Sequence, residues 1–220
     1  MILAAGRGER LRPLTDNCPK PLIKVNGKPL ILYHLQKLRD IGISTVVVNS
    51  AWLSDMICDY LGSGSQFGLK IIHSVEQAGG LETAGGIINA LDNFNNEPFL
   101  VINGDTFIDG DYSQFLVDLN KNEMAHLFMV DNPPHNLKGD FSLLDGKVTK
   151  GTEFTFSGVA VYKPQAFKGY KAERMPLKPL FEKWLKREQL FGCKLQGAWF
   201  DAGTVERIDA IEKYIKENKV

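Results

Sequence analysis

The sequence predicts an α/β fold: a mixed, mostly parallel β-sheet with helices on both faces, in a single domain over residues 1–220. Short apolar segments alternate with amphipathic helical segments through the first half, and this alternation is typical of right-handed βαβ units. The second half contains a hairpin signal, so the antiparallel strands should come mainly from there. No linker, repeat or block of like charge divides the sequence.

The elements of the first half can be assigned in order. A short strand over residues 1–5 precedes a loop rich in glycine and arginine, and a helix begins at about Pro29 and stops at Gly42. Thr45–Asn49 is a continuous β-branched run, which predicts a strand buried on both faces. Ser54 is expected to cap the next helix. Further strands are expected at 70–73 and 99–103, with a helix at 83–91 between them.

The second half begins with a hairpin. Asp145-Gly146 stands between two apolar runs and is a strong signal for a two-residue turn. Strands are then expected at 155–162 and 198–200, and helices at 177–187 and from about Val205. In the last helix three isoleucines share one face, and Glu212 precedes Lys216 by four residues.

Composition excludes several classes of protein. Lys plus Arg number 26 and Asp plus Glu number 26, so the zero net charge argues against nucleic acid or an anionic membrane as a partner. No apolar run approaches the roughly 18 residues of a membrane span. Cys18, Cys58 and Cys193 are odd in number and widely spaced, which favours a reduced, cytoplasmic compartment over a disulfide framework or a zinc site.

The loop after the first strand predicts a phosphate site. Gly6 and Gly8 let the backbone approach an anion, and the loop lies at the carboxyl end of a parallel strand. Between Arg7 and Lys24 there are five basic residues and two acidic ones. A Walker motif is absent, and Leu11 stands where a dinucleotide fingerprint needs a third glycine. The alternative is a tight strand-to-helix turn without a ligand.

Two carboxylates are candidate metal ligands. Asp105 follows the apolar strand at 99–103, and Asp201 follows the short strand at 198–200. Carboxylates that converge beside a cationic phosphate loop suit a hard Mg²⁺ ion. The alternative is a turn-forming role for Asp105 and a capping role for Asp201.

Together these motifs resemble those of the sugar-phosphate nucleotidyltransferases, also called nucleotide-sugar pyrophosphorylases. The resemblance implies a GT-A-like (Rossmann-like) fold and a Mg²⁺-dependent reaction, in which a sugar 1-phosphate attacks the α-phosphorus of a nucleoside triphosphate and pyrophosphate leaves. The matching segments run through the whole chain in the family's order: Leu3–Gly6, Gly8–Arg10, Pro13–Thr15, Pro19–Leu22, Leu81–Gly85, Asn103–Asp105, Phe156–Gly158 and Asp201–Thr204.

The resemblance also implies a role for individual residues. Arg10 and Lys20 would be catalytic, and Asp105 and Asp201 would hold the metal. Glu76 and Gln77 both remain candidates for reading the base. The implied nucleotide-binding residues are Leu3, Ala4, Gly6, Gly8, Glu9, Arg10, Lys20, Glu76, Gly80 and Thr83, and the implied sugar-phosphate-binding residues are Asn103, Asp140, Ser157 and Gly158.

Within the family, the segments 49–53, 81–86 and 130–141 resemble enzymes that use UTP and N-acetylmuramic acid 1-phosphate, in cell-wall recycling. The products would be UDP-N-acetylmuramic acid and pyrophosphate. Donors for the lactyl carboxylate of this sugar are expected on the loop 132–138, at Asn132, His135, Asn136 and Lys138. The alternatives are a mannose-1-phosphate guanylyltransferase, another hexose-1-phosphate nucleotidyltransferase, or a non-catalytic nucleotide-sugar sensor. The sequence does not predict an oligomeric state.

Overall fold

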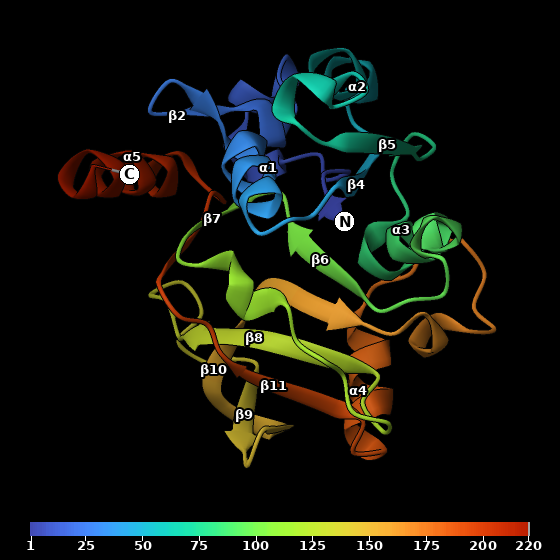
Figure 1. Cartoon of the computed structure of the whole chain (residues 1–220). Helices are drawn as coiled ribbons and strands as arrows, with labels where there is room; N and C mark the ends of the chain where they lie inside the picture. Colours follow the sequence, from blue (N-terminus) through green and yellow to red (C-terminus); the bar gives the residue numbers. More distant parts are fainter. Residues whose placement is uncertain (220) are drawn as a thin grey trace.

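The computed structural model describes residues 1–219 and contains a twisted eight-stranded sheet (Figure 1). Its strands lie in the order β11-β8-β10-β6-β1-β4-β5, and β9 pairs with β10 beside this path. All strands of the path except β10 run in the same direction, so the predicted mixed, mostly parallel sheet is confirmed. The strands are β1 (Ile2–Leu3), β4 (Thr45–Ser50), β5 (Lys70–Val75), β6 (Phe99–Asn103), β8 (Ala125–Asp131), β9 (Phe141–Leu144), β10 (Lys147–Tyr162) and β11 (Leu190–Lys194).

Helices cover both faces of this sheet, as predicted. Side chains alternate along a strand, so Val46 and Val48 face one hydrophobic cluster while Val47 faces the other. The Val46 side packs against α1 and α2, and the Val47 side against α3 and α4. The helices are α1 (Leu30–Asp40), α2 (Ser54–Leu61), α3 (Glu82–Ala90), α4 (Lys178–Lys186) and α5 (Val205–Asn218).

The sheet reverses its winding at β1. The chain passes from β1 outward to β4 and β5, then returns to place β6 on the other side of β1. Ligands of open α/β sheets bind at such a switch point, outside the carboxyl ends of the strands. Here these ends are Leu3 and Asn103, which are direct neighbours in the sheet.

Two smaller strand pairs complete the fold. β7 (Thr106–Asp109) pairs with β12 (Ala198–Asp201), and β2 (Lys24–Val25) pairs with β3 (Lys28–Pro29). Helix α5 follows β12 and packs its predicted face of Ile208, Ile211 and Ile215 onto a third cluster, which also contains Leu11. α5 therefore lies at the side of the molecule (Figure 1), and β12 brings Asp201 next to β7.

Most local predictions of secondary structure are confirmed. Asp145 and Gly146 both have positive φ, 49° and 78°, as a tight hairpin turn requires. The prediction for Ser54 is wrong: Leu53 is the N-cap residue of α2, and no side chain caps the helix. The strand expected at 155–162 is longer, because β10 continues from Lys147, and β7, β8 and β11 were not predicted. Among residues 1–219 no helix is long and apolar enough to cross a lipid bilayer.

Candidate active site

A cavity of about 280 Å³ lies at the switch point, and we call it the switch-point cavity. Of the predicted nucleotide-binding residues, Leu3, Ala4, Gly6, Lys20, Gly80 and Thr83 line it. Asn103 and Asp105, predicted for the sugar phosphate and the metal, line it as well. The structure therefore brings together, at one sheet edge, residues from four separate segments of the sequence. The other lining residues are Ala5, Arg7, Pro21, Asn49, Gly79 and Glu82.

Lys20 is the buried cation of this cavity. The residue is only 7% exposed, and its Nζ atom lies 2.6 Å from Asp105 Oδ2. A buried ammonium needs an anion beside it, and here that anion is the carboxylate at the end of β6. A phosphate that enters the cavity would meet a positive charge held at a fixed position.

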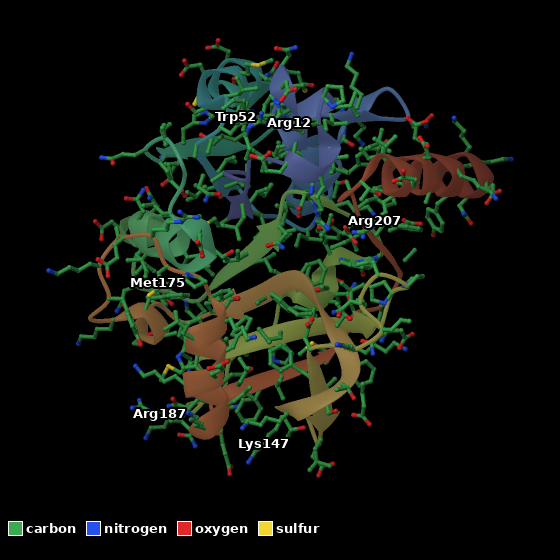
Figure 2. All side chains as sticks on the ribbon, turned by 180° about the vertical axis from the view of Figure 1, so that it is seen from behind. Arg12, Trp52, Lys147, Met175, Arg187 and Arg207 are labelled. Atoms are coloured by element: carbon green, nitrogen blue, oxygen red, sulfur yellow. The ribbon has the colours of Figure 1, made fainter. Side chains whose placement is uncertain are left out.

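The loop over residues 6–16, which the sequence predicts to bind phosphate, is braced by Arg7 and Trp52. The Arg7 guanidinium lies 3.7 Å from the centre of the Trp52 ring and donates hydrogen bonds to the Thr15 carbonyl and to Asp16 Oδ1, each at 2.7 Å. Trp52 Nε1 donates to the same Thr15 carbonyl at 2.9 Å. The hydrogen bond from Arg7 lowers the pKa of Asp16. Figure 2 shows Trp52 and Arg12 on the same side of the molecule, where the loop meets α2.

Gly8 is required by the closure of this loop. Its φ of 70° favours glycine, and a Cβ atom there would lie 2.8 Å from the Thr15 methyl carbon. Thr15 Oγ1 also donates a hydrogen bond to the Gly8 carbonyl. Gly8, Glu9 and Arg10 do not line the switch-point cavity in this structure. The Arg10 guanidinium instead lies near Gly203, in the turn after Asp201.

Glu76 and Asn49 form a buried network behind the cavity wall. Asn49 Oδ1 accepts a hydrogen bond from the Ala4 backbone, and its Nδ2 atom donates to Glu76 Oε1 at 2.7 Å. Glu76 Oε2 accepts from the Leu81 backbone at 2.7 Å. Glu76 is 6% exposed and holds the loop that reaches Gly80, whereas Gln77 is exposed. Of the two candidates for recognising the base, Glu76 is thus buried and hydrogen-bonded, whereas Gln77 is exposed to solvent.

A backbone hydrogen bond holds the turn after Asp201 next to Asp105. The Ala202 N–H donates to the Asp105 carbonyl at 2.8 Å. The Asp201 side chain contacts Arg207 and the Gly203 N–H through Oδ1, and His135 Nε2 lies 2.7 Å from Oδ2. Within the described part of the chain, this buried Oδ2 atom accepts no hydrogen bond of good geometry. Arg207, at the start of α5, is labelled in Figure 2.

The residues predicted for the sugar phosphate are not all at one place. Gly158 packs against Asn103, because a Cβ atom at its φ of 81° would lie 2.5 Å from Asn103 Nδ2. The Ser157 hydroxyl is buried and donates to the Phe128 carbonyl, so it does not face the switch-point cavity. Asp140 lies apart from this cavity and accepts hydrogen bonds from the Phe156 backbone and Asn136.

Most of the donors predicted on the loop 132–138 are already engaged. Asn132 Nδ2 donates to the Thr152 carbonyl, Asn136 Nδ2 donates to Asp140 and Thr155, and His135 contacts Asp201. These contacts fold the loop onto β10 and β12. Among the four predicted donors, only Lys138 has no partner in the part of the chain described. The expectation of a carboxylate site on this loop stays a prediction, and three of its four residues would have to exchange a present contact for the substrate.

The two aspartates fit a magnesium ion better than a metal held by the protein alone. No group of three or more His, Cys, Asp or Glu side chains in residues 1–219 could hold a metal ion. Mg²⁺ is commonly bound through one or two carboxylates, with phosphate oxygens and water completing its shell. Asp105 lines the switch-point cavity and Asp201 lines a neighbouring cavity beside His135, whose Nε2 atom lies 2.7 Å from Asp201 Oδ2. These two carboxylates are donors of the type that Mg²⁺ takes, once His135 gives up its contact.

The comparison with known proteins defines the class. Residues 1–141 match the nucleotidyl transferase family, so the chain belongs to this family. An N-acetylmuramate α-1-phosphate uridylyltransferase of Neisseria meningitidis is 48% identical over 217 residues, which cover 94% of each chain. A mannose-1-phosphate guanylyltransferase of Oryza sativa is 29% identical over 92% of this chain and 60% of its own length.

Solved structures agree with the fold. A glucose-1-phosphate thymidylyltransferase of Bacillus anthracis superposes with a TM-score of 0.85 at 22% identity, over 98% of this chain and 94% of that one. HddC of Yersinia pseudotuberculosis, in complex with GMP-PN, has a TM-score of 0.79 at 22% identity, over 97% of both chains. The expected fold and the identification as a sugar-1-phosphate nucleotidyltransferase are confirmed.

Sequence reasoning did not single out Asn49, Arg7 and Arg207 as individual site residues. Asn49 is a polar residue within the buried strand β4, and burial of an amide among β-branched residues is a signal that could have found it. Arg7 was counted only within the basic loop. Arg207 lies six residues beyond Asp201, and only the fold brings its guanidinium onto that carboxylate.

Proposed function

We propose that this protein transfers a uridylyl group from UTP to N-acetylmuramic acid 1-phosphate, giving UDP-N-acetylmuramic acid and pyrophosphate. The observation that carries the proposal is the 48% identity, over 94% of both chains, to a uridylyltransferase with this substrate. The buried Lys20 beside a metal-type carboxylate supports the reaction class independently of that relative. The proposed compartment is the cytoplasm.

In this reaction the protein mainly has to align the two phosphates and to neutralise their negative charge. A sugar phosphate is already an anionic nucleophile, so no general base is required. Backbone groups of Leu3, Ala4 and Gly6 would hold the nucleotide, and Lys20 would contact both the attacking phosphate and the α-phosphate. Such a contact strengthens as negative charge shifts in the transition state, and it therefore accelerates the reaction.

Magnesium is the proposed cofactor, held by Asp105 and Asp201. When bound, the ion neutralises charge on the triphosphate and orients the α-phosphate. Arg207 and His135, which contact Asp201 in this structure, would then compete with the ion for its carboxylate. Asp105 would exchange part of its contact with Lys20 for the metal.

The role of the metal can be measured by Mg²⁺ titration of activity in Asp105→Asn and Asp201→Asn. Each variant should lose at least about a hundredfold in kcat, because the ion lowers the activation barrier by several kcal/mol and each aspartate is needed to hold it. Asp111→Asn serves as a control, since Asp111 only caps a surface turn. Full activity of either site variant would remove that aspartate from the metal site.

Substrate choice is tested with a panel. Initial rates of pyrophosphate release should be highest for UTP with N-acetylmuramic acid 1-phosphate. The matched pairs are UTP with N-acetylglucosamine 1-phosphate, UTP with glucose 1-phosphate, GTP with mannose 1-phosphate and dTTP with glucose 1-phosphate. Faster release from GTP with mannose 1-phosphate would instead assign the guanylyltransferase activity of the Oryza sativa relative.

A further inference from the structure

The switch-point cavity has two ends of different character. On its wall, Asn103 of β6 and Asn49 of β4 both lie opposite Leu3 of β1, one on each side. Neighbouring strands are about 4.8 Å apart, so the two asparagines lie about 10 Å apart across the sheet edge. The ion pair of Lys20 and Asp105 marks the β6 end, because Asp105 follows that strand. A nucleotide whose α-phosphate is bound at Lys20 therefore has to place its nucleoside toward β4.

The segment Gly79–Thr83 forms the wall at the β4 end. A Cβ atom on Gly80 would lie 3.7 Å from the Ala51 side chain, directly after β4, and 3.9 Å from the Ala5 carbonyl, just beyond β1. The segment thus bridges the ends of these two strands. Glu82, the first residue of α3, lines the cavity within it and therefore stands beside the expected position of the nucleoside.

Glu82 carries a free carboxylate oxygen at this end of the cavity. Arg174 Nε donates to Glu82 Oε1 at 3.0 Å, and within residues 1–219 the Oε2 atom forms no hydrogen bond. The neighbouring carboxylate of Glu76 is different, because a side-chain amide and a backbone N–H occupy its two oxygens. Asp105 lies at the other end. A carboxylate only accepts hydrogen bonds, so Glu82 suits a substrate group that donates one.

The contact with Arg174 does not commit the Glu82 carboxylate to a structural role. The side chain of Arg174 is 71% exposed and that of Glu82 is 39% exposed, and ion pairs so exposed contribute little to stability. The segment before α4 is attached to α3 in another way, because the Met175 carbonyl accepts hydrogen bonds from the Ala84 and Gly85 N–H groups. This attachment does not depend on Glu82.

Glu188 resembles Glu82 in everything but its place. Glu82 has a φ of 58° and Glu188, in the turn after α4, a φ of 53°, so both adopt a backbone conformation that favours glycine. Glu188 is likewise exposed and paired with a cation, Lys147, at 2.8 Å. It does not line the switch-point cavity. The two glutamates therefore differ in access to a nucleotide, which makes Glu188 a matched control.

We propose that the Glu82 carboxylate accepts a hydrogen bond from the nucleoside of the substrate and thereby contributes to nucleotide selection. The inference rests on the proposed function, because it assumes a nucleoside triphosphate with its α-phosphate at Lys20. The phosphates offer no donor, whereas uridine offers the N3–H of uracil and the two ribose hydroxyls. Glu82 is a specificity-determining residue and takes no part in bond making.

The test measures Kd by calorimetry with Mg²⁺ and without sugar phosphate, for UTP, 3-methyl-UTP, 2′-deoxy-UTP and 3′-deoxy-UTP. Each analogue lacks one donor and keeps the three phosphates, so the panel identifies the group that Glu82 contacts. The wild type should bind UTP at least about tenfold more tightly than the analogue without that donor. Glu82→Ala and Glu82→Gly should reduce this preference to less than about threefold, by weakening UTP and not the analogue. Glu82→Gln keeps an acceptor oxygen and should give an intermediate preference.

Three control variants separate recognition from folding. Glu188→Ala, Glu188→Gly and Arg174→Gln should keep the preference of the wild type. At both glutamate positions the glycine variant should have a higher Tm than the alanine variant, because glycine relieves the strain of positive φ. Equal loss of preference in Glu82→Ala and Glu82→Gly, despite their different stabilities, would therefore support a direct contact with the nucleotide.

The outcomes distinguish this inference from the proposed function. If the Glu82 variants keep the preference, or if Arg174→Gln loses it as well, the role of Glu82 is overturned while the proposed function stands. Equal affinity of the wild type for UTP and all three analogues also overturns that role. If the wild type binds GTP more tightly than UTP, the proposed function itself is wrong, whatever the Glu82 variants do.

Discussion

Lys20 and Asp105 show how a single ion pair can organise a site. They are 85 residues apart in sequence, and the switch point of the sheet brings their side chains to 2.6 Å. Because Lys20 is nearly buried, its ammonium is held by packing before a substrate arrives, and preorganised charge is the most effective kind in catalysis. The pair therefore holds a cation at a fixed position, and in the proposed reaction a phosphate would replace Asp105 as its partner.

Replacing Lys20 by alanine should lower kcat about 100- to 1000-fold while changing KM for UTP by less than about tenfold. The reason is that its contact strengthens as charge shifts onto the transferred phosphate. Steady-state rates of pyrophosphate release over a range of UTP concentrations would measure both quantities. Lys24→Ala, an exposed lysine on β2, is the control. A variant with normal kcat and only a raised KM would restrict Lys20 to binding.

At the scale of elements, an irregularity in β10 lies beside Asn103 at the switch-point cavity. The register between β10 and β8 shifts between Phe156 and Val159, so Ser157 and Gly158 form a bulge in the middle of a long strand. The Ser157 hydroxyl satisfies the Phe128 carbonyl there, and Gly158 lets Asn103 approach. The bulge thus determines where Asn103 lies against the sugar side of the site.

Gly158→Ala should impair catalysis more than its effect on stability explains. A side chain at φ 81° costs about 1–2 kcal/mol, and its Cβ atom would also displace Asn103. Gly146→Ala is a matched control: φ there is 78°, and no atom lies within 4 Å of the added Cβ. We expect a larger loss of Tm in Gly158→Ala than in Gly146→Ala, because only the first adds a clash to the strain of positive φ, and, at a temperature where both are folded, a fall of at least about tenfold in kcat/KM for the sugar 1-phosphate only in Gly158→Ala. Equal activity in the two variants would contradict this role of the bulge.

At the scale of the whole molecule, a buried histidine joins the first helix to the strand behind the site. His34 on α1 is fully buried, with its Nε2 atom 2.7 Å from the Thr106 carbonyl and its Nδ1 atom 2.8 Å from the Tyr112 hydroxyl. Nε2 therefore carries the proton, and Nδ1 accepts from Tyr112. Burial lowers the pKa of His34 to about 4, despite the hydrogen bond to Thr106, which acts in the opposite direction.

His34 should make stability depend on pH. In the unfolded chain its pKa is about 6.5, so between about pH 6.5 and pH 4 the unfolded state binds more protons than the folded state. Its contribution is complete above pH 6.5 and falls by about 3 kcal/mol as the pH drops to 4. The free energy of unfolding, measured with urea at about pH 7 and pH 4.5, should differ less in His34→Gln than in the wild type. An unchanged difference would assign the acid sensitivity to other groups.

The sequence by itself determined the features that depend on local patterns. Three consecutive valines in β4 have to be buried on both sides and Asp145-Gly146 has to turn. Glycines beside arginines after β1 predict a phosphate loop. These predictions need only the period of a strand, the φ angles of a tight turn and the approach of the backbone to an anion. The family resemblance then supplied the reaction.

Only the tertiary structure decided which of these groups meet and which are already in use. Asp201 lies next to Asp105 because β12 pairs with β7, a strand with no signal of its own in the sequence. The sequence offered Asn132, Asn136 and His135 as free donors, yet contacts with β10 and Asp201 occupy them in the folded chain. Pairing between residues far apart in sequence depends on the whole packed chain, and no local pattern records it.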